Sequence, residues 1–302
     1  MLAIVIPYYK ITFFEETLQS LSIQTDKRFM VYIGDDASTE EPLVLLEKYK
    51  GQFEFVYRRF DENLGSISLV KQWNRCIALT AREEWLMILG DDDSLSPNCV
   101  ADFYFNLDEI IENQCKVVRF ASIVNDAVHQ KQSSLYKHPK LEKATDFFYK
   151  SLKNQTRSSL SEYVFRYEAY LKYNFHNYDL AWYADDRAWL EFSNFGIIYT
   201  INSSHLIIGL SNENISRASY KIEIKQQSKS TFFKYFILNN LFQFGRKQRL
   251  DLLLHYEQIV YRCGKVNFRL WVRVFSLFLI NFNFIHAVKF SRRVLIYFKK
   301  HE

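Results

Sequence analysis

The sequence predicts an α/β protein with a mixed, mostly parallel sheet and helices on both faces. Short apolar segments rich in β-branched residues alternate with amphipathic segments through the first hundred residues, and strands that alternate with crossover helices form parallel sheets. Only 8 Gly and 4 Pro occur among 302 residues, which disfavours an all-β protein with many turns. Because 48% of the residues are hydrophobic, the chain can bury a large core.

The expected elements follow from the spacing of apolar residues along the chain. Helices are predicted where that spacing is helical, over 12–24, 43–49, 69–79 and 183–192. The segment 126–160 is polar and lacks either periodicity, so we expect a mobile loop there. Strands are predicted over 3–9, 29–33, 53–58, 85–89, 117–124, 197–201 and 205–208.

Charge divides the chain into an acidic front part and a basic tail. Residues 229–302 contain 14 Lys or Arg and 3 Asp or Glu, a net charge of +11. Residues 1–228 contain 25 Lys or Arg and 31 Asp or Glu, a net charge of −6. Such asymmetry indicates two roles. We therefore expect a main domain over 1–225 and a helical region, basic and aromatic, over 226–302.

The start of the chain and its cysteines indicate a cytoplasmic protein. Met1 leads directly into a strand-like run, with no basic segment of a secretion signal before it. No two of the four cysteines have the spacing of a zinc site, and a chain of this length does not depend on disulfides. We expect reduced thiols at Cys76, Cys99, Cys115 and Cys263.

Three of the predicted strands end in residues suited to ligand binding. These ends are Pro7-Tyr8-Tyr9, Asp35-Asp36 and Asp91-Asp92-Asp93. In open α/β sheets, ligands bind outside the carboxyl ends of the strands. We therefore expect the three ends to form one site at the same edge of the sheet.

The aspartate run Asp91-Asp92-Asp93 is the strongest single candidate for that site. Adjacent carboxylates repel one another unless a cation neutralises them, and Mg²⁺ or Mn²⁺ prefers such oxygen ligands and bridges to substrate phosphates. The alternative is helix capping, because acids are favoured at the start of the helix expected near Pro97. Three consecutive acids exceed what capping requires. Asp35 and Asp36 have the same two interpretations, as nucleotide-binding carboxylates or as helix caps.

Four motifs in register resemble the family-2 glycosyltransferases, which have a GT-A (Rossmann-like) fold. The family has roughly IIIPxYN, IIVVDDGSTD, NxGxxxxRN and GEYIxFLDxDDxxxP. The corresponding segments here are IVIPYYK, VYIGDDASTE, ENLG followed by WNRCIAL, and EEWLMILGDDDSLSP. Order and spacing agree across residues 3–97, and a weaker match extends to about residue 216. The resemblance implies an inverting, metal-dependent transferase that uses a nucleotide-sugar donor.

The resemblance assigns the first two strand ends to the nucleotide. Pro7 and Tyr8 would line the base pocket, with Tyr9 at the same strand end. Asp36 would read the uracil-like edge of the base, and Asp35 would support Asp36. These residues are the expected nucleotide-sugar contacts.

The resemblance also separates the roles within the aspartate run. Counted back from Pro97, Asp92 and Asp93 fall on the paired aspartates of the family's DXD motif. Asp93 is then the expected ligand of Mn²⁺ or Mg²⁺, and Asp92 is its partner in donor binding. Gly90 replaces the first family aspartate, so the ribose and metal contacts of that residue would pass to Asp91.

Two further positions carry roles that the resemblance implies. Lys71 or Arg75 would contact the donor diphosphate, although a solvated helix face explains either residue equally well. Asp185 aligns with the family's general base, and Asp186 is the alternative base. A capped helix start with a surface pair between an aspartate and Arg187 is the structural alternative for this acidic pair.

The basic tail interleaves aromatic residues with Lys and Arg. Its longest run without Lys, Arg, His, Asp or Glu, 274–285, has 12 residues, fewer than the roughly 20 that span a bilayer. Amphipathic cationic helices suit the surface of an anionic membrane. The alternative is a helical region that packs on the main domain or forms a homodimer. The chain has no recognisable nucleic-acid module, so we expect no nucleic-acid partner.

The resemblance implies transfer of a sugar from a nucleotide-sugar donor, most simply a UDP-sugar, to an acceptor hydroxyl. The expected acceptor is a glycan or a polyprenyl-diphosphate-linked oligosaccharide in capsule, O-antigen or exopolysaccharide assembly, at the inner face of the plasma membrane. The alternative is a non-catalytic nucleotide-sugar-binding or scaffold protein of the same fold. A sugar nucleotidyltransferase is disfavoured, because YYKITFFEE contains no Gly-rich phosphate loop.

Overall fold

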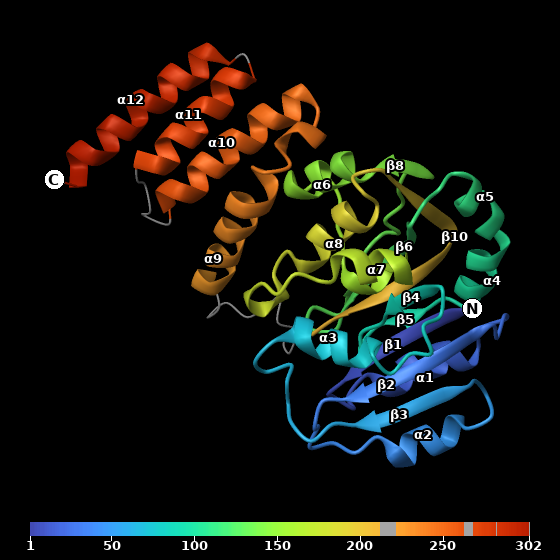
Figure 1. The fold of residues 1–302 in the computed structure, drawn as a ribbon. Coiled ribbons are helices and arrows are strands. Elements are labelled where there is room, and N and C mark those ends of the chain that lie inside the picture. The colour runs from blue at the N-terminus through green and yellow to red at the C-terminus, as the bar shows by residue number, and fades with distance from the viewer. Residues whose placement is uncertain (212–221, 263–267, 282, 302) are drawn as a thin grey trace. The chain divides into compact units, whose positions relative to one another are not determined.

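The computed structural model describes residues 1–211, 222–262, 268–281 and 283–301, and Figure 1 labels most of their helices and strands. The chain forms two compact units, Met1–Ser219 and Tyr220–Glu302. The assignment of 1–225 to catalysis and of 226–302 to membrane or oligomer contacts stays a prediction.

The described part of the first unit contains one mixed sheet, in the order β3-β2-β1-β4-β9-β6-β10-β5. The first four strands in this order are parallel to one another, and β6 is parallel to β10. The short strand β9 lies between β4 and β6 and is antiparallel to both. The strands are β1 (Leu2–Tyr8), β2 (Phe29–Asp35), β3 (Phe55–Arg59), β4 (Trp85–Ile88), β5 (Ser94–Leu95), β6 (Val117–Asp126), β7 (Lys131–Gln132), β8 (Leu141–Lys143), β9 (Tyr163–Arg166) and β10 (Ile197–Leu210).

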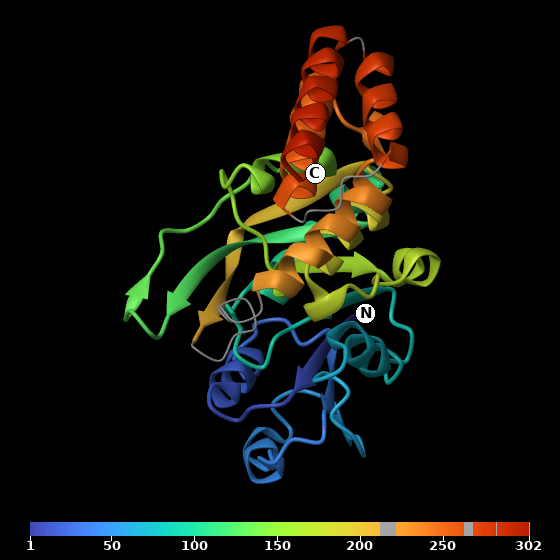
Figure 2. The same ribbon diagram turned by 90° about the vertical axis from the view of Figure 1, so that its left-hand side faces the viewer.

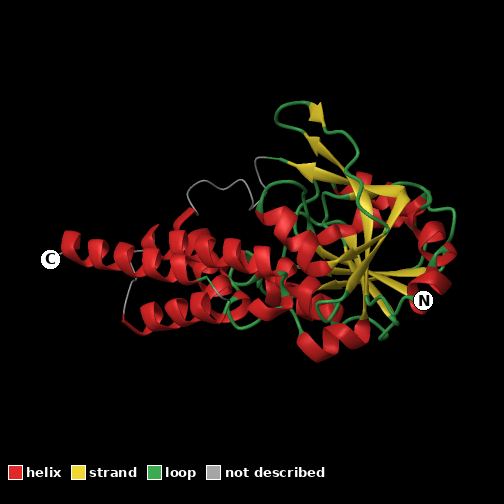
Figure 3. Ribbon diagram, turned by 90° about the horizontal axis from the view of Figure 1, so that it is seen from above, coloured by secondary structure: helices red, strands yellow, loops and turns green. Residues whose placement is uncertain are grey.

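Helices cover both faces of this sheet (Figure 3), so the predicted fold class is confirmed. One core cluster joins alternate strand residues such as Ile4 and Ile6 to α1, α2, α4 and α5, as the period of two along a strand requires. On the other face, α3 packs on β1 and β2, and α6, α7 and α8 pack together. The helices are α1 (Phe14–Ser22), α2 (Leu43–Tyr49), α3 (Leu69–Ile77), α4 (Cys99–Phe105), α5 (Leu107–Glu112), α6 (Ala144–Leu152), α7 (Tyr167–Tyr173) and α8 (Ala184–Phe192).

The prediction of a mobile loop over 126–160 is wrong, because the segment contains β7, β8 and α6. Phe147 and Phe148 of α6 are buried, and β8 pairs with β10. Tertiary burial of a few aromatic side chains thus orders a segment whose polar composition indicated a loop. The two strands expected over 197–201 and 205–208 form the single strand β10, with a register shift between Ile201 and His205. β6 and β10 run side by side over most of their length (Figure 2).

The second unit is helical in its described part, as the sequence predicts. In it, α10, α11 and α12 lie side by side (Figure 1). The rings of Phe278 and Phe290 join α11 to α12, with centroids 5.8 Å apart. Among the described residues, none of the helices combines the length and apolarity that a membrane crossing requires. The α-helices are α9 (Ile222–Phe232), α10 (Arg246–Arg262), α11 (Phe268–Ile280) and α12 (Phe284–His301).

Candidate active site

A pocket of about 420 Å³ opens in the first unit at the carboxyl ends of β1, β2 and β4. This is the edge where the sequence places its three polar strand ends. Residues from all three ends line the pocket, together with parts of α3 and of the loop before it. The lining residues are Pro7, Tyr9, Lys10, Thr12, Phe13, Asp36, Asn63, Gly65, Ser66, Leu69, Gln72, Asp91, Asp92 and Ser211.

Asp91 joins two of the strand ends. Its Oδ2 accepts hydrogen bonds from the backbone amides of Tyr9 and Lys10, at 2.8 and 2.9 Å. Burial raises the pKa of Asp91 to about 6. The carboxylate therefore fixes the segment after β1 against the segment after β4 while it lines the pocket.

Asp93 is buried, and it is not among the described residues that line the pocket. Its Oδ1 accepts from the Gly209 amide at 2.9 Å, and its Oδ2 accepts from the Ser161 hydroxyl at 2.5 Å. Burial, followed by the charge of Asp92, raises the pKa of Asp93 to about 7. A Cβ on Gly209 would collide with the Asp92 carbonyl oxygen, so glycine permits this close approach of β10 to the aspartate run.

Asp35 is fully buried and its carboxylate is engaged within the protein. Oδ1 accepts from the Ser38 amide at 2.8 Å, and Oδ2 accepts from the Tyr57 hydroxyl at 2.6 Å and from Arg59 Nη1 at 3.0 Å. These contacts fix the turn after β2, which carries Asp36. The geometry is compatible with the predicted supporting role of Asp35.

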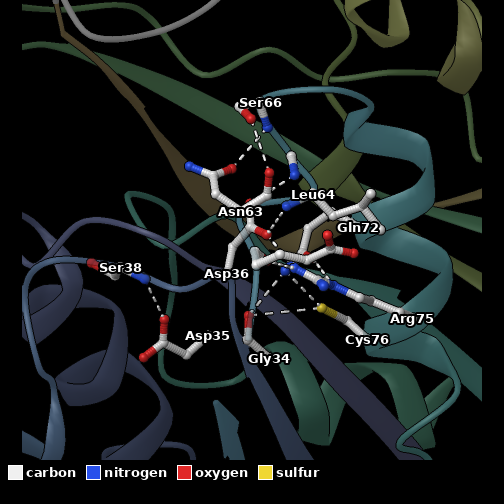
Figure 4. Close-up of polar contacts among 12 residues, drawn as sticks. Gly34, Asp35, Asp36, Ser38, Asn63, Leu64, Ser66, Gln72, Arg75 and Cys76 are labelled. Atoms are coloured by element: carbon white, nitrogen blue, oxygen red, sulfur yellow. Dashed lines mark hydrogen bonds and ion pairs between the residues drawn. The ribbon is translucent and has the colours of Figure 1, made fainter. Parts of the chain in front are cut away.

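Asp36 anchors the loop between β3 and α3 to the end of β2 (Figure 4). Its carboxylate accepts from the amides of Leu64 and Gly65, at 2.7 and 2.8 Å, and forms an ion pair with Arg75. A Cβ on Gly65 would collide with Asp36 Oδ2. The Asn-Leu-Gly motif therefore has a structural reason here: its backbone amides bind the carboxylate, and glycine leaves room for it. Burial raises the pKa of Asp36.

Arg75 forms part of this anchor. Besides Asp36 it donates to Gln72 and to the Glu62 carbonyl oxygen, and its guanidinium lies over the Phe60 ring. Lys71 is exposed on α3, and neither Arg75 nor Lys71 is among the described residues that line the pocket. The contact of Lys71 or Arg75 with the donor diphosphate therefore remains a prediction from the sequence.

Lys10 is a pocket-lining cation that the motif comparison did not single out. It directly follows the strand end Pro7-Tyr8-Tyr9, at the position where the family wording has Asn. That departure from the family pattern is the signal that could have identified it. Asn63, Ser66 and Gln72 are further polar lining residues that sequence reasoning missed, because their relation to the pocket depends on how the loop before α3 folds.

Arg75→Gln is expected to lower the free energy of unfolding by about 2–3 kcal/mol, because the buried Asp36 carboxylate loses its ion pair and keeps only two backbone donors. Lys71→Gln is the matched control, since it removes one charge from an exposed position of the same helix and should change stability by less than about 0.5 kcal/mol. Urea denaturation followed by circular dichroism measures both. Equal, small losses in the two variants would contradict the anchoring role of Arg75.

Asp185 and Asp186 lie in the first turn of α8, after Tyr183 in the left-handed conformation with φ of 73°. Burial raises the pKa of both aspartates, and the charge of Asp185 raises the pKa of Asp186 further. Backbone amides at the helix start partly offset burial for Asp185. Arg187, the expected surface partner, pairs with Glu191 at 2.9 Å.

The described lining of the pocket does not include this acidic pair. The Ser68 hydroxyl donates to Asn177 Oδ1 at 2.6 Å, which ties the segment before α8 to the start of α3. Leu69 and Gln72 of α3 line the pocket. Asp185 and Asp186 thus lie on α8, and the segment before α8 is hydrogen-bonded to the start of α3, which forms part of the pocket wall.

Within the described ranges, no group of three or more His, Cys, Asp or Glu side chains is arranged so that it could hold a metal ion. Cys76, Cys99 and Cys115 are buried and free, and Cys263 lies outside the described residues. The predicted ligands Asp91 and Asp93 are separated by their protein contacts, one toward Tyr9 and Lys10 and the other toward Ser161 and Gly209.

A mixed α/β sheet with acidic residues at the carboxyl ends of β2 and β4 matches the architecture of GT-A glycosyltransferases. The sequence model described as Glycosyl transferase family 2 matches residues 3–175, more than half of the chain. The chain therefore belongs to glycosyl transferase family 2. No curated protein matches the sequence.

Solved structures of TarS from S. aureus are similar in fold. The TarS 1–349 complex with UDP-GlcNAc has a TM-score of 0.59 at 14% identity, and the complex with UDP has 0.56 at 15%; both comparisons cover 100% of this chain and 92% of that one. A longer TarS structure gives 0.56 at 16% identity and covers 95% of this chain. This chain spans about half of that longer one, 53%. At these identities the similarity shows the fold alone.

Proposed function

We propose that this protein transfers a sugar from a UDP-sugar donor to an acceptor hydroxyl with inversion at the anomeric carbon. The observation that carries the proposal is the pocket at the carboxyl ends of β1, β2 and β4, with Asp36, Asp91 and Asp92 in its lining. Membership of glycosyl transferase family 2 supports the reaction. The solved complexes of TarS with UDP and with UDP-GlcNAc support the donor class.

In this proposal the nucleotide lies along the ends of β1 and β2. Pro7, Tyr9 and Asp36 line the pocket and contact the nucleotide directly. Tyr8 is buried, and its hydroxyl donates to the Glu40 carbonyl oxygen at 2.6 Å. Tyr8 and the fully engaged Asp35 therefore act by holding the strand ends that carry Pro7, Tyr9 and Asp36.

We also propose a Mn²⁺ or Mg²⁺ site at the aspartate run, held by carboxylates together with substrate phosphates, since the described residues alone form no group that could hold the ion. Asp91 and Asp92 line the pocket. Asp93 is buried, but a carboxylate has about four acceptor sites. Its two hydrogen bonds, from Gly209 and Ser161, therefore leave acceptor capacity for a metal ion. Mg²⁺ is commonly held by one or two carboxylates together with substrate phosphates. When bound, the ion would stabilise the negative charge of the departing nucleoside diphosphate.

The acidic pair of α8 supplies the base of the proposed reaction. Asp185 accepts the proton of the acceptor hydroxyl as that oxygen attacks the anomeric carbon, while the bond from that carbon to the diphosphate oxygen breaks. A single displacement of this kind inverts the configuration and requires no nucleophilic side chain. The acceptor we propose is a glycan or a polyprenyl-diphosphate-linked oligosaccharide in surface-polysaccharide assembly, reached from the inner face of the plasma membrane.

A nucleotide-sugar panel tests the donor assignment. Purified protein with Mn²⁺ is measured by thermal shift against UDP-, GDP- and dTDP-sugars, and the anomeric configuration of any product is read by NMR. Stabilisation by a UDP-sugar and an inverted product are expected. The absence of stabilisation by every nucleotide sugar in the panel would overturn the proposal.

Lys10→Gln is expected to weaken UDP binding by roughly 10–100-fold and uridine binding by less than about twofold, because a lysine in the pocket lining contributes a charge-assisted bond to the diphosphate. Lys71→Gln is the matched control, with the same charge removed outside the described lining. Isothermal titration with UDP and with uridine measures the difference. An equal loss for both ligands would show that Lys10 does not act through the diphosphate, and a selective loss in Lys71→Gln would restore the original assignment.

A further inference from the structure

One side of α12 is exposed and combines apolar with basic residues. Phe284, Ile285, Val288 and Leu295 are 61%, 68%, 67% and 63% exposed. Their spacing of three, four and seven residues places them on the same side of a helix. We define the α12 face as the exposed residues Phe284, Ile285, Val288, Lys289, Arg292, Leu295, Ile296 and Lys299.

The opposite side of α12 already has its partners. Ala287, Phe290 and Val294 are buried, and Phe290 packs against Phe278 of α11. Arg293 forms an ion pair with Glu257 of α10. Packing of the second unit therefore uses this opposite side and leaves the α12 face outward in the unit.

The sequence of α11 and α12 contains no acidic residue, whereas it contains the basic residues Arg269, Arg273, Lys289, Arg292, Arg293, Lys299 and Lys300. Exposed apolar residues also occur on α11, at Phe268, Val272 and Ile280. A surface with apolar side chains among positive charges complements a partner that is apolar in its interior and negative at its surface. An anionic lipid bilayer has that chemistry.

Two other occupants fit the α12 face less well. A second copy that used the same face in a two-fold dimer would bring the basic set Lys289, Arg292 and Lys299 against the same set of the other copy, with like charges opposed. A nucleic acid would satisfy the charges through its phosphates, but it would leave the exposed side chains of Ile285, Val288 and Leu295 without an apolar partner.

We propose that the α12 face is a docking surface for an anionic lipid bilayer. The helix lies in the plane of the interface, its apolar side chains enter the boundary between head groups and acyl chains, and its Lys and Arg side chains extend toward lipid phosphates. The inference rests on the proposed location at the inner membrane face and not on the transfer reaction. Docking would bring the enzyme to the surface that carries a polyprenyl-linked acceptor.

Co-sedimentation of the full chain with vesicles tests this surface. The protein is mixed with vesicles of phosphatidylcholine alone or of phosphatidylcholine with phosphatidylglycerol, at low and high salt. Binding only to the anionic vesicles, with a decrease at high salt, is expected. The variant Lys289→Gln/Arg292→Gln/Lys299→Gln should lose on the order of a hundredfold in partitioning at low salt, and Ile285→Ser/Leu295→Ser should also bind more weakly.

The matched control is Arg246→Gln/Lys247→Gln/Arg262→Gln, which removes three exposed charges of the same unit from α10 and should change partitioning by only a few-fold. Circular dichroism establishes that each variant is folded. Equal losses in the two charge variants, or no vesicle binding by the wild type, would overturn the proposal. A sedimentation mass that falls from dimer to monomer in Ile285→Ser/Leu295→Ser would instead assign the face to a second copy. UDP-sugar binding measured on the same samples distinguishes failure of docking from failure of the donor assignment.

Discussion

Asp185→Asn is expected to lower kcat by roughly 10²–10⁴-fold and to leave donor affinity close to that of the wild type. Asparagine keeps the shape of the side chain but cannot accept a proton from the acceptor hydroxyl. Donor binding should persist, because the described lining of the pocket does not include Asp185. Single-turnover transfer, together with titration of UDP, separates the two effects.

The environment of the acidic pair favours Asp185 over Asp186 as the base. The charge of Asp185 raises the pKa of Asp186 beyond the effect of burial, whereas amides at the start of α8 act against burial at Asp185. With Asp185 as the base, Asp186→Asn should change kcat by only a few-fold. If Asp186→Asn is the inactive variant, the roles are reversed. If both variants stay active, neither aspartate is the base.

The same pair predicts the acidic limb of the pH profile. A base acts as its carboxylate, so kcat should rise as pH increases through the pKa of Asp185. Burial raises this pKa above the ordinary 3.8 of an aspartate, so the limb should lie at higher pH than for an exposed aspartate. The limb should disappear in Asp185→Asn. A limb that is unchanged in this variant would show that another group titrates.

Asp93→Ala is expected to remove Mn²⁺-dependent transfer, with a loss of roughly 10³-fold, because a bound metal contributes several kcal/mol of charge stabilisation. The buried contacts of Asp93 with Gly209 and Ser161 make a second substitution necessary. Asp93→Asn can still accept from the Gly209 amide and can donate to Ser161, so it separates folding from metal binding. Activity as a function of Mn²⁺ concentration and thermal unfolding are measured for both variants.

The outcomes for the aspartate run distinguish three roles. If a folded Asp93→Asn variant loses Mn²⁺-dependent transfer, Asp93 is a ligand of the metal. If this variant keeps Mn²⁺-dependent transfer and Asp91→Asn loses it, the metal is held by the residues that line the pocket. If Asp93→Ala keeps donor binding and its cellular role and the wild type has no transfer activity, the protein is a nucleotide-sugar-binding scaffold.

The periodicity of apolar residues was sufficient to predict most elements of the first hundred residues. The strands at β1, β2 and β4 and the helices at α2 and α3 were predicted within a few residues, because each has a local pattern of apolar residues. β9 and α7 were missed, since Tyr163–Arg166 is a short strand without alternating burial and becomes a strand by insertion between β4 and β6. α6 was missed because polar residues surround its few buried aromatic ones.

The sequence by itself determined the fold class, the family, and the placement of Asp36, Asp91 and Asp92 at one edge of the sheet. Each depends on motifs and periodicities within short segments, which local chain geometry converts into strand ends. Only the tertiary structure decided which side chains line the pocket and which hold its walls. Asp93 meets Ser161 and Gly209, 68 and 116 residues away along the chain, and Arg75 meets Asp36 across the loop before α3. Such contacts depend on the register between distant elements, which the sequence of one segment does not contain.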